Sequence, residues 1–334
     1  MPVKIGINGL GRTGRTALRA ALQNKEVEVV ALNSRADTRT VAHLLKYDSV
    51  YGRYPGEIRY TEDSLIINGR KIPYFRSSDP LNIPWRDYGV EVAIESTGVF
   101  KTREEAFKHI KAGAERVLVS APMSDPDITL VLGINDDKYD PRKHKVVSMA
   151  SCTTNAAVPV LKVINDEFGI IKAFLTTVHA YTGNQRLVDK SHKDLRRARA
   201  AAMNIIPTST GASKAIVQVL PELRDKIDAV AIRVPIIDGS LIDLSIEVSR
   251  DVSANEVNNV LKRAAEGNLK GILEYTEDPI VSSDIIGNSS LSIIDATLTK
   301  VIGGNLVKVF AWYDNEWGYS CKLIELTAKI LSRR

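Results

Sequence analysis

The chain has 334 residues, 44% of them hydrophobic, which predicts a globular protein of two domains with a core in each. Lys and Arg outnumber Asp and Glu by 45 to 40, but these charges are scattered and no aromatic-basic block accompanies them, so an anionic small molecule fits better than nucleic acid as a partner. Two cysteines without zinc-type spacing exclude a disulfide framework and predict no metal, and because no apolar stretch reaches signal or membrane length we expect a cytoplasmic protein.

The first predicted element is a strand, Val3–Asn8, that runs into a glycine-rich turn and then a helix. Glycines follow the pattern G-x-G-x-x-G, and a second strand is predicted at residues 27–32. In this setting Gly9, Gly11 and Gly14 allow a tight turn and the close approach of a pyrophosphate, whose charge lies at the helix N-terminus. The pattern predicts a dinucleotide site, although a glycine turn needed only for packing would have the same sequence.

The residues after the second strand bear on the kind of dinucleotide. An NAD-specific site presents Asp or Glu there for the ribose 2′-hydroxyl, whereas this chain has Asn33, Ser34 and Arg35. A hydroxyl and a guanidinium can hydrogen-bond a 2′-phosphate, which a carboxylate would repel. We therefore favour NADP over NAD, while Asp37 leaves a contact with an NAD ribose open.

Strands and helices alternate in the first half of the chain. Short apolar runs at residues 91–96 and 117–120 predict strands, and between them residues 102–105 form a capping box for a helix that Gly113 closes. The alternation predicts a parallel, doubly wound sheet.

The pattern changes after residue 150. Apolar and polar residues alternate over 242–249, as in an antiparallel strand with one solvated face. A second capping box at residues 253–256 opens a helix. The second domain should therefore contain a mixed or antiparallel sheet with helices.

A cysteine among small polar residues opens the second half of the chain. Cys152 lies within residues 150–157, just before an apolar helical pattern that Pro159 should kink near its start. At a helix N-terminus, unpaired N–H groups and the helix dipole stabilise a thiolate, so Cys152 is a candidate nucleophile. A small buried hydrophobic residue is the alternative from this segment alone.

His179 is the strongest candidate for a base beside Cys152. It follows a predicted strand at residues 171–175, whereas His43, His109, His144 and His192 have helical or charged surroundings and are expected at the surface. Cysteine and histidine within hydrogen-bond reach would form a thiolate–imidazolium pair and later pass a proton.

Several stretches together closely resemble phosphorylating glyceraldehyde-3-phosphate dehydrogenases, and the likeness covers essentially the whole chain. They are residues 7–14, 43–49, 150–155, 179–185, 194–200, 207–211 and 312–319. The resemblance implies an α/β fold: a Rossmann doubly wound parallel sheet at residues 1–151, an α+β catalytic domain with a mixed or antiparallel sheet at 152–316, and a C-terminal helix at 317–334 that packs back on the Rossmann domain. It also implies a homotetramer in glycolysis, gluconeogenesis or the Calvin cycle.

The resemblance also implies the chemistry. Cys152 would attack the aldehyde of glyceraldehyde 3-phosphate, and His179 would remove the hydroxyl proton as hydride passes to the nicotinamide of NADP or NAD. Inorganic phosphate would then release 1,3-bisphosphoglycerate from the thioester. The substrate-phosphate positions are Thr182, Arg233 and Arg197, and the inorganic-phosphate positions are Ser151, Thr153, Thr210 and Gly211. The cofactor positions are Gly9, Gly11, Arg12, Thr13, Gly14, Asn33, Ser34, Arg35, Arg76, Thr97, Ser120, Lys190, Ser191 and Asn315.

Departures from the family pattern again concern the cofactor. Lys190-Ser191 replaces a Leu-Pro pair in the loop that reaches a neighbouring subunit's cofactor, and serine there resembles the NADP-using members. Ala156 replaces the usual second cysteine, which removes a local partner for oxidation of Cys152.

Three other functions are weighed. Erythrose-4-phosphate dehydrogenase shares the fold and the thiol chemistry, but Tyr181, Thr182, Gly183 and Arg186 fit the glyceraldehyde-phosphate branch better. The alternatives of other classes are a nucleic-acid-binding or scaffolding protein and a catalytically silent redox sensor. The retained cysteine, histidine and anion positions argue that a binding role is secondary.

Overall fold

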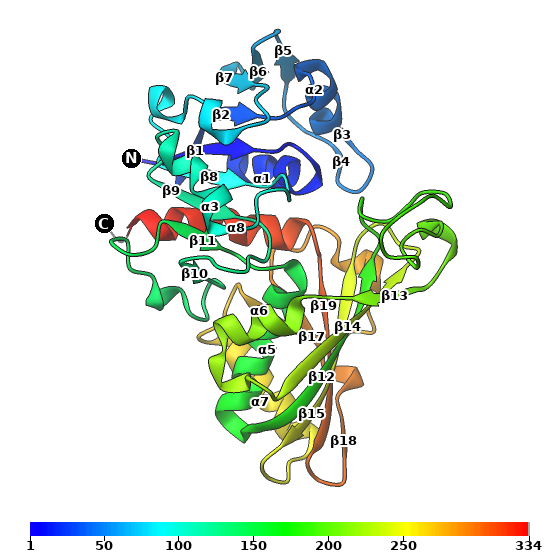
Figure 1. The fold of residues 1–334 in the computed structure, drawn as a ribbon. Coiled ribbons are helices and arrows are strands. Elements are labelled where there is room, and N and C mark those ends of the chain that lie inside the picture. Colours follow the sequence, from blue (N-terminus) through cyan, green and yellow to red (C-terminus); the bar gives the residue numbers. More distant parts are fainter. Residues whose placement is uncertain (333–334) are drawn as a thin grey trace. The chain divides into compact units, whose positions relative to one another are not determined.

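The structure is a computed structural model that describes residues 1–332 and contains two compact units. Unit 1 consists of Met1–Ala150 together with the C-terminal segment from Ser320, and unit 2 is Ser151–Tyr319. Figure 1 labels the helices and strands of both units.

A nine-stranded sheet forms the centre of unit 1. Its strands are β1 (Val3–Asn8), β2 (Val27–Asn33), β5 (Ile58–Tyr60), β6 (Ser64–Ile67), β7 (Arg70–Phe75), β8 (Val92–Glu95), β9 (Arg116–Val119), β10 (Ile128–Thr129) and β11 (Val146–Ser148). The spatial order is β10-β11-β9-β8-β1-β2-β7-β6-β5, with parallel pairing from β10 to β7. Every residue of β8 and β9 is buried, as expected for parallel strands covered on both faces. The doubly wound parallel sheet is confirmed.

The helices of unit 1 follow the predicted local signals. They are α1 (Arg12–Gln23), α2 (Thr38–Lys46), α3 (Arg103–Ala106) and α4 (Lys108–Lys111), with the small hairpin β3 (Tyr47–Asp48) and β4 (Gly52–Arg53) and 3₁₀ turns at Pro80–Asn82, Trp85–Tyr88 and Asp136–Lys138. The predicted capping box is present, because Thr102 and Glu105 exchange hydrogen bonds at the start of α3. Gly113 ends this region with φ +109°, a left-handed conformation that glycine adopts without strain.

The last helix, α8 (Trp317–Ser332), contributes to unit 1 from Ser320 onward. Leu323 and Leu326 are fully buried. The ammonium of Lys329 forms an ion pair with the carboxylate of Asp136, in the same unit. Burial of the apolar face, with this ion pair, holds the helix in unit 1.

Unit 2 contains a mixed sheet of eight strands. They are β12 (Ile170–Ala180), β13 (Ile206–Ser209), β14 (Ile227–Val234), β15 (Ser240–Val248), β16 (Leu273–Thr276), β17 (Ser292–Asp295), β18 (Lys300–Ile302) and β19 (Leu306–Tyr313). Their order is β13-β14-β12-β15-β19-β17-β16, and β18 pairs with β19. The pairs β12–β14 and β16–β17 are parallel and the others antiparallel, which confirms the expected mixed sheet.

Alternation along β15 decides which face of the sheet forms the core. Ile242, Leu244, Ile246 and Val248 are fully buried, and the residues between them are partly exposed. Figure 1 shows α5 (Cys152–Phe168), α6 (Ala212–Val219) and α7 (Ala254–Glu266) together on one side of this sheet. Short 3₁₀ turns occur at Ala201–Met203, Pro221–Leu223, Ser282–Ile285 and Ala296–Leu298.

Two local predictions concern the helices of unit 2. The capping box at Ser253 and Glu256 is present at the start of α7. Pro159 lies inside α5, and the helix continues through it to Phe168. The kink expected at Pro159 stays a prediction.

Within residues 1–332, no helix is both long enough and apolar enough to cross a membrane.

Candidate active site

Cys152 is the first residue of α5, as the sequence predicts. Ser151 precedes it as the N-cap, and its hydroxyl accepts the backbone N–H of Thr154 at 3.1 Å. The long apolar helix that follows buries most of its residues and so fixes the position of its first turn. Cys152 itself remains partly exposed.

The side chain of His179 contacts that of Cys152 within unit 2. Its Nε2 lies 3.4 Å from Sγ of Cys152, within hydrogen-bond distance for sulfur. The histidine is the second-to-last residue of β12 and is 3% exposed. The structure therefore brings together the thiol and the imidazole that were predicted to form the pair, out of two cysteines and five histidines in the sequence.

Arg233 contacts the other side of the imidazole. The parallel register of β12 and β14 sets His179 opposite Arg233. Nδ1 of His179 lies 2.7 Å from the carbonyl oxygen of Ala180 and 2.7 Å from Nη1 of Arg233. Nη1 of Arg233 also donates to the Ala180 oxygen at 2.9 Å. Because a guanidinium can only donate, Nη1 of Arg233 and Nδ1–H of His179 can both be satisfied only by donating to the same Ala180 oxygen, and in that tautomer Nε2 presents a lone pair to the thiol.

Desolvation opposes charge on both members of the pair. It raises the pKa of Cys152 to about 11, and the nearby Arg233 cation lowers this pKa only in part. Desolvation also lowers the pKa of His179 to about 3, and Arg233 lowers it further. Burial in the empty site thus opposes the expected thiolate–imidazolium pair, and Arg233 offsets this for the thiol only in part. In its neutral form the imidazole can accept the thiol proton across the 3.4 Å contact.

Tyr313 supports the pair from β19. Its ring meets the ring of His179 edge to face, with centroids 5.9 Å apart. Its hydroxyl lies 3.0 Å from the hydroxyl of Thr153 and 2.8 Å from that of Thr177. Burial raises the pKa of Tyr313, so the phenol keeps its proton. Sequence reasoning gave Tyr313 no role, although a tyrosine on the inward-facing side of an alternating strand needs a buried hydroxyl partner.

The positions predicted to bind anions lie on three further segments of unit 2. Arg197 donates from Nε to the Thr208 hydroxyl at 2.8 Å and from Nη2 to the Ser209 carbonyl at 3.0 Å. The burial of Arg233 lowers the pKa of its own guanidinium, and the positive charge of Arg197 lowers this pKa further by a smaller amount. Two guanidinium groups that act on each other electrostatically form a suitable environment for a phosphate.

Thr210 and Gly211 open a second helix, α6. Gly211 is the N-cap and supplies no side-chain cap, while the Thr210 hydroxyl accepts the backbone N–H of Ala212 at 3.2 Å. A Cβ on Gly211 would meet no atom within 4 Å, so space is open there. Thr182 donates its backbone N–H to the Gln185 side chain at 3.1 Å. Asn315 is 8% exposed and its side-chain oxygen accepts the hydroxyl proton of Ser240 at 2.6 Å.

The glycine turn of unit 1 fits a dinucleotide. Gly9 has φ +93°, and a Cβ on Gly14 would lie 1.8 Å from the Gly9 carbonyl oxygen, so both glycines are required by packing. Gly11 differs, because a Cβ there would meet nothing within 4 Å. Gly11 also caps α1 without a side chain, which leaves the helix N-terminus open to an anion. Arg12 pairs with Asp48 at 2.6 Å, and Thr13 follows it at the partly exposed start of α1.

The segment after β2 places a hydroxyl and a guanidinium, rather than a carboxylate, directly after Asn33. Ser34 is partly exposed and Arg35 exposed, and Nη2 of Arg76 donates to the Arg35 carbonyl at 3.3 Å. Asp37 is the residue for which the sequence left a contact with an NAD ribose open. Its carboxylate caps α2 by accepting the Thr40 N–H at 2.8 Å. Asn33 is buried and its amide is engaged within the protein, so it can offer a ligand only its main chain.

The remaining cofactor positions differ in exposure. Thr97 is held by the buried carboxylate of Glu95, and the Ser120 hydroxyl donates to the Glu95 carbonyl at 3.1 Å. Lys190 and Ser191 are exposed, and Lys190 donates its backbone N–H to the Ala198 carbonyl at 2.9 Å.

His109 corrects one expectation. It was expected at the surface with His43, His144 and His192, but it is fully buried. Its ring accepts a hydrogen bond from the Trp85 indole at 2.9 Å and lies 3.1 Å from the Glu95 carboxylate. Sequence spacing could not reveal this, because Trp85 and Glu95 come from separate segments of unit 1.

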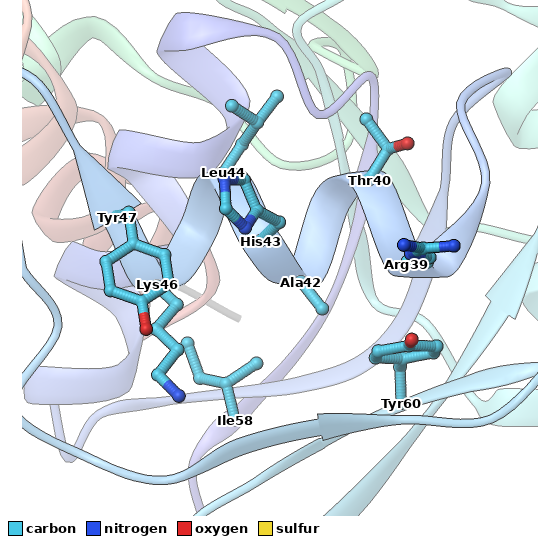
Figure 2. Close-up of a pocket in the computed structure, with 9 residues that line it drawn as sticks. All are labelled: Arg39, Thr40, Ala42, His43, Leu44, Lys46, Tyr47, Ile58 and Tyr60. Atoms are coloured by element: carbon cyan, nitrogen blue, oxygen red, sulfur yellow. The ribbon is translucent and has the colours of Figure 1, made fainter.

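A separate pocket of about 460 Å³ lies over α2 and contains none of the predicted site residues. Figure 2 shows its lining, which includes His43, Lys46 and Tyr47 from the helix region and Tyr60 from β5. Among the described residues there is no group of three or more His, Cys, Asp or Glu side chains that could hold a metal ion.

Comparison with known proteins places these features in context. Residues 3–103 match the family described as glyceraldehyde 3-phosphate dehydrogenase, NAD binding domain, and residues 151–315 match glyceraldehyde 3-phosphate dehydrogenase, C-terminal domain. The chain is 54% identical over 328 residues to glyceraldehyde-3-phosphate dehydrogenase 2 of Streptomyces avermitilis, with 98% of each chain covered. It is 53% identical over 333 residues to glyceraldehyde-3-phosphate dehydrogenase of Geobacillus stearothermophilus, which covers 100% of this chain and 99% of the relative. Its identity to the Thermotoga maritima protein of the same name is 53% over 330 residues, with 98% of this chain and 99% of the relative covered.

Proposed function

Because the chain belongs to the glyceraldehyde 3-phosphate dehydrogenase family, we propose that it oxidises glyceraldehyde 3-phosphate, with a nicotinamide cofactor and inorganic phosphate, to 1,3-bisphosphoglycerate. The observation that carries the proposal is the 3.4 Å contact between Sγ of Cys152 and Nε2 of His179, with Arg233 beside the same imidazole.

Steady-state turnover of the purified protein tests this function. Oxidation of glyceraldehyde 3-phosphate that requires inorganic phosphate, and that exceeds the rate with erythrose 4-phosphate, is the expected result. Absence of turnover, as in a silent thiol sensor, or a preference for erythrose 4-phosphate would contradict it.

The first step joins Cys152 to the substrate. As sulfur attacks the aldehyde carbon, the thiol proton passes to Nε2 of His179 and then to the former carbonyl oxygen, which gives a thiohemiacetal hydroxyl. This transfer needs a neutral imidazole, and the lowered pKa of His179 provides it. The tautomer with Nδ1–H donated to Ala180 leaves Nε2 free to accept.

The second step forms a thioester. The nicotinamide, when bound, supplies the hydride acceptor for this oxidation. His179 takes the hydroxyl proton at Nε2 while the carbon loses hydride, so the carbonyl reforms as the thioester of Cys152. Phosphate then attacks that carbonyl carbon, the C–S bond breaks, and His179 returns its proton to the sulfur.

Arg233 connects substrate binding to the base. Its positive charge lowers the pKa of His179 in the empty site. A substrate phosphate paired with Arg233 would neutralise that charge, and the pKa of His179 would then rise. His179 would thus become a stronger base once a phosphorylated substrate is bound.

Arg233→Ala should lower kcat/KM for glyceraldehyde 3-phosphate about tenfold to a hundredfold more than kcat/KM for unphosphorylated glyceraldehyde, because a charge-assisted bond to the phosphate is lost. The ratio of the two kcat/KM values is the measurement, because the loss of Arg233 also changes the pKa values of Cys152 and His179, and this affects both aldehydes. Arg196→Ala, at an exposed arginine nearby, is the control and should leave the ratio unchanged. Equal losses for both aldehydes in Arg233→Ala would show a purely structural role.

The cofactor part of the proposal is NADP, alone or beside NAD. Three observations on the segment after β2 support it: the absence of a carboxylate at Asn33, Ser34 and Arg35, the use of Asp37 as a helix cap, and the approach of Arg76 to Arg35. A 2′-phosphate carries about −1.5 to −2 charges near neutral pH, which guanidinium and hydroxyl groups complement.

Ser34→Asp combined with Lys190→Leu and Ser191→Pro should move the ratio of kcat/KM towards NAD by at least about tenfold, or about 1.4 kcal/mol. The change should appear mainly in KM for NADP, because the substituted groups complement the 2′-phosphate rather than the reacting ring. Lys193→Leu, at another exposed lysine of the same loop, is the control. A wild type that strongly prefers NAD, or an unchanged ratio in the triple variant, would refute the cofactor assignment.

A homotetramer in the cytoplasm completes the proposal. The loop that contains Lys190 and Ser191 has strongly exposed apolar side chains, with Leu187 at 80% and Leu195 at 81% exposure. Phe174 on β12 is 67% exposed. Apolar side chains of this kind are usually covered in an assembly. The domain limits 1–151, 152–316 and 317–334 belong to the same proposal.

A further inference from the structure

A chain of buried polar groups crosses the carboxyl ends of three parallel strands in unit 1. Asn8, Asn33 and Glu95 are the last residues of β1, β2 and β8, and Asn8 is in register with both of the others. Each is 3% exposed or less. None of the proposed catalytic steps uses these groups. The carboxyl ends of parallel strands are where ligands bind in open α/β sheets.

Four hydrogen bonds converge on the carboxylate of Glu95. Oε2 accepts Nδ2 of Asn8 at 2.6 Å and lies 3.1 Å from Nε2 of His109. Oε1 accepts the backbone N–H of Thr97 at 2.7 Å and also the Thr97 hydroxyl. A buried carboxylate with this many partners is strongly fixed in position.

The direction of every bond in this chain can be assigned from its ends. The Trp85 indole can only donate, so Nδ1 of His109 accepts at 2.9 Å, and the proton of the neutral ring on Nε2 points to Glu95. At the other end the Ser77 backbone N–H donates to Oδ1 of Asn33 at 2.9 Å, which leaves Nδ2 of Asn33 to donate to Oδ1 of Asn8 at 2.7 Å. Nδ2 of Asn8 must then donate to Glu95.

All donors therefore point at residue 95, and only a group that accepts on both oxygens satisfies them. A glutamine of the same shape would place an NH₂ group against Asn8 and His109 or against Thr97. The amides cannot reverse to accommodate it, because the Ser77 backbone and the Trp85 indole fix the two ends.

This chain of hydrogen bonds ends at the segments proposed to hold the cofactor. Asn33 directly precedes Ser34 and Arg35, and Ser77 directly follows Arg76. The Ser34 backbone N–H also donates to the Phe75 carbonyl at 3.1 Å, which ties the two segments together. On the other side, Glu95 holds Thr97, another proposed cofactor contact.

We infer that Glu95 is a positioning residue for the dinucleotide: through Asn8 and Asn33 on one side and Thr97 on the other, its carboxylate fixes the segments that bind the adenosine ribose. This inference rests on the proposed function. It assigns Glu95 no contact with the reacting atoms.

The test compares Glu95→Gln with Asp127→Asn. Asp127 is a matched control because its carboxylate also accepts several bonds, from the Lys145 and Val146 backbone N–H groups at 2.8 Å and from Arg103, but at the amino end of β11. Titration calorimetry should show the Kd for NADP⁺ raised at least about tenfold in Glu95→Gln and within about twofold of wild type in Asp127→Asn. In Glu95→Gln, KM for NADP⁺ should also rise more than kcat falls.

Several outcomes would overturn the inference. One is an unchanged Kd in Glu95→Gln with a Tm lowered as in Asp127→Asn, and another is an equal rise of Kd in both variants. If Glu95→Gln does not fold, Asn8→Ala replaces it, because this variant breaks the link to Asn33 while Thr97 and His109 still donate to Glu95. It should weaken adenosine 2′,5′-bisphosphate at least about fivefold, and unchanged binding would overturn the inference. A wild type that binds neither NADP⁺ nor NAD⁺ would refute the proposed function itself.

Discussion

Replacement of Cys152 by serine should lower kcat for glyceraldehyde 3-phosphate oxidation by at least about 10⁴-fold and leave the Kd for the cofactor unchanged. The serine hydroxyl would occupy the same place at the start of α5, but it is a far weaker nucleophile and its ester is not the thioester that phosphate cleaves. Single-turnover kinetics and cofactor titration on the same preparation measure the two quantities.

The other cysteine provides the matched control. Cys321 is also partly exposed and without a disulfide, and Cys321→Ser should keep wild-type turnover. Iodoacetamide should inactivate the wild type in step with alkylation of Cys152, because His179 can accept the thiol proton as the sulfur reacts. Inactivation that follows alkylation of Cys321, or an active Cys152→Ser, would refute the nucleophile assignment.

His179→Asn should lower kcat/KM about 10²-fold to 10⁴-fold, the usual contribution of a positioned general base. Burial holds the pKa of His179 near 3, well below its ordinary value, so the imidazole is neutral at every pH above that and the base form is present throughout pH 5–8. Wild-type kcat/KM, which reports the free enzyme, should therefore show no acid-side loss from His179 in this range. The variant must pass the proton to solvent, so its residual rate should increase with pH.

The pH dependence of kcat/KM between pH 5 and 8 distinguishes these profiles. His43→Asn, at an exposed histidine on α2, is the control and should match the wild type. A wild-type rate that falls with an apparent pKa near 6.5, with no such fall in His179→Asn, would show that the imidazole is charged in solution. Wild-type rates in His179→Asn at all pH values would remove the residue from the mechanism.

Sequence reasoning succeeded where a signal is local. The glycine turn before α1, the capping boxes at Thr102 and Ser253, and the alternation along β15 each depend on residues within a few positions of one another. Such patterns determine the direction and burial of a single element. They were sufficient to predict a parallel sheet followed by a mixed one.

Sequence reasoning failed where segments distant in the chain meet. Burial of His109 depends on Trp85 and Glu95, and the role of Tyr313 depends on Thr153 and Thr177. The effect of burial on the thiol was missed for a related reason, because a helix N-terminus is visible in sequence whereas desolvation is set by everything packed around the sulfur. The place of Arg233 came from family resemblance, and its position opposite His179 follows from strand register.

The hydroxyl of Ser151 limits which residues evolution or an engineer can place before the nucleophile. It accepts the Thr154 N–H with a lone pair, and its own hydrogen remains able to donate to a neighbour or to an incoming oxyanion. Aspartate would cap α5 as well as serine but would repel the phosphate, and glycine would offer no donor. Alanine would lose the donor and about 1 kcal/mol of helix stability. Only serine, threonine and asparagine combine a helix cap with an uncharged anion donor in one short side chain, so a substitution library at this position should return these three alone among active variants.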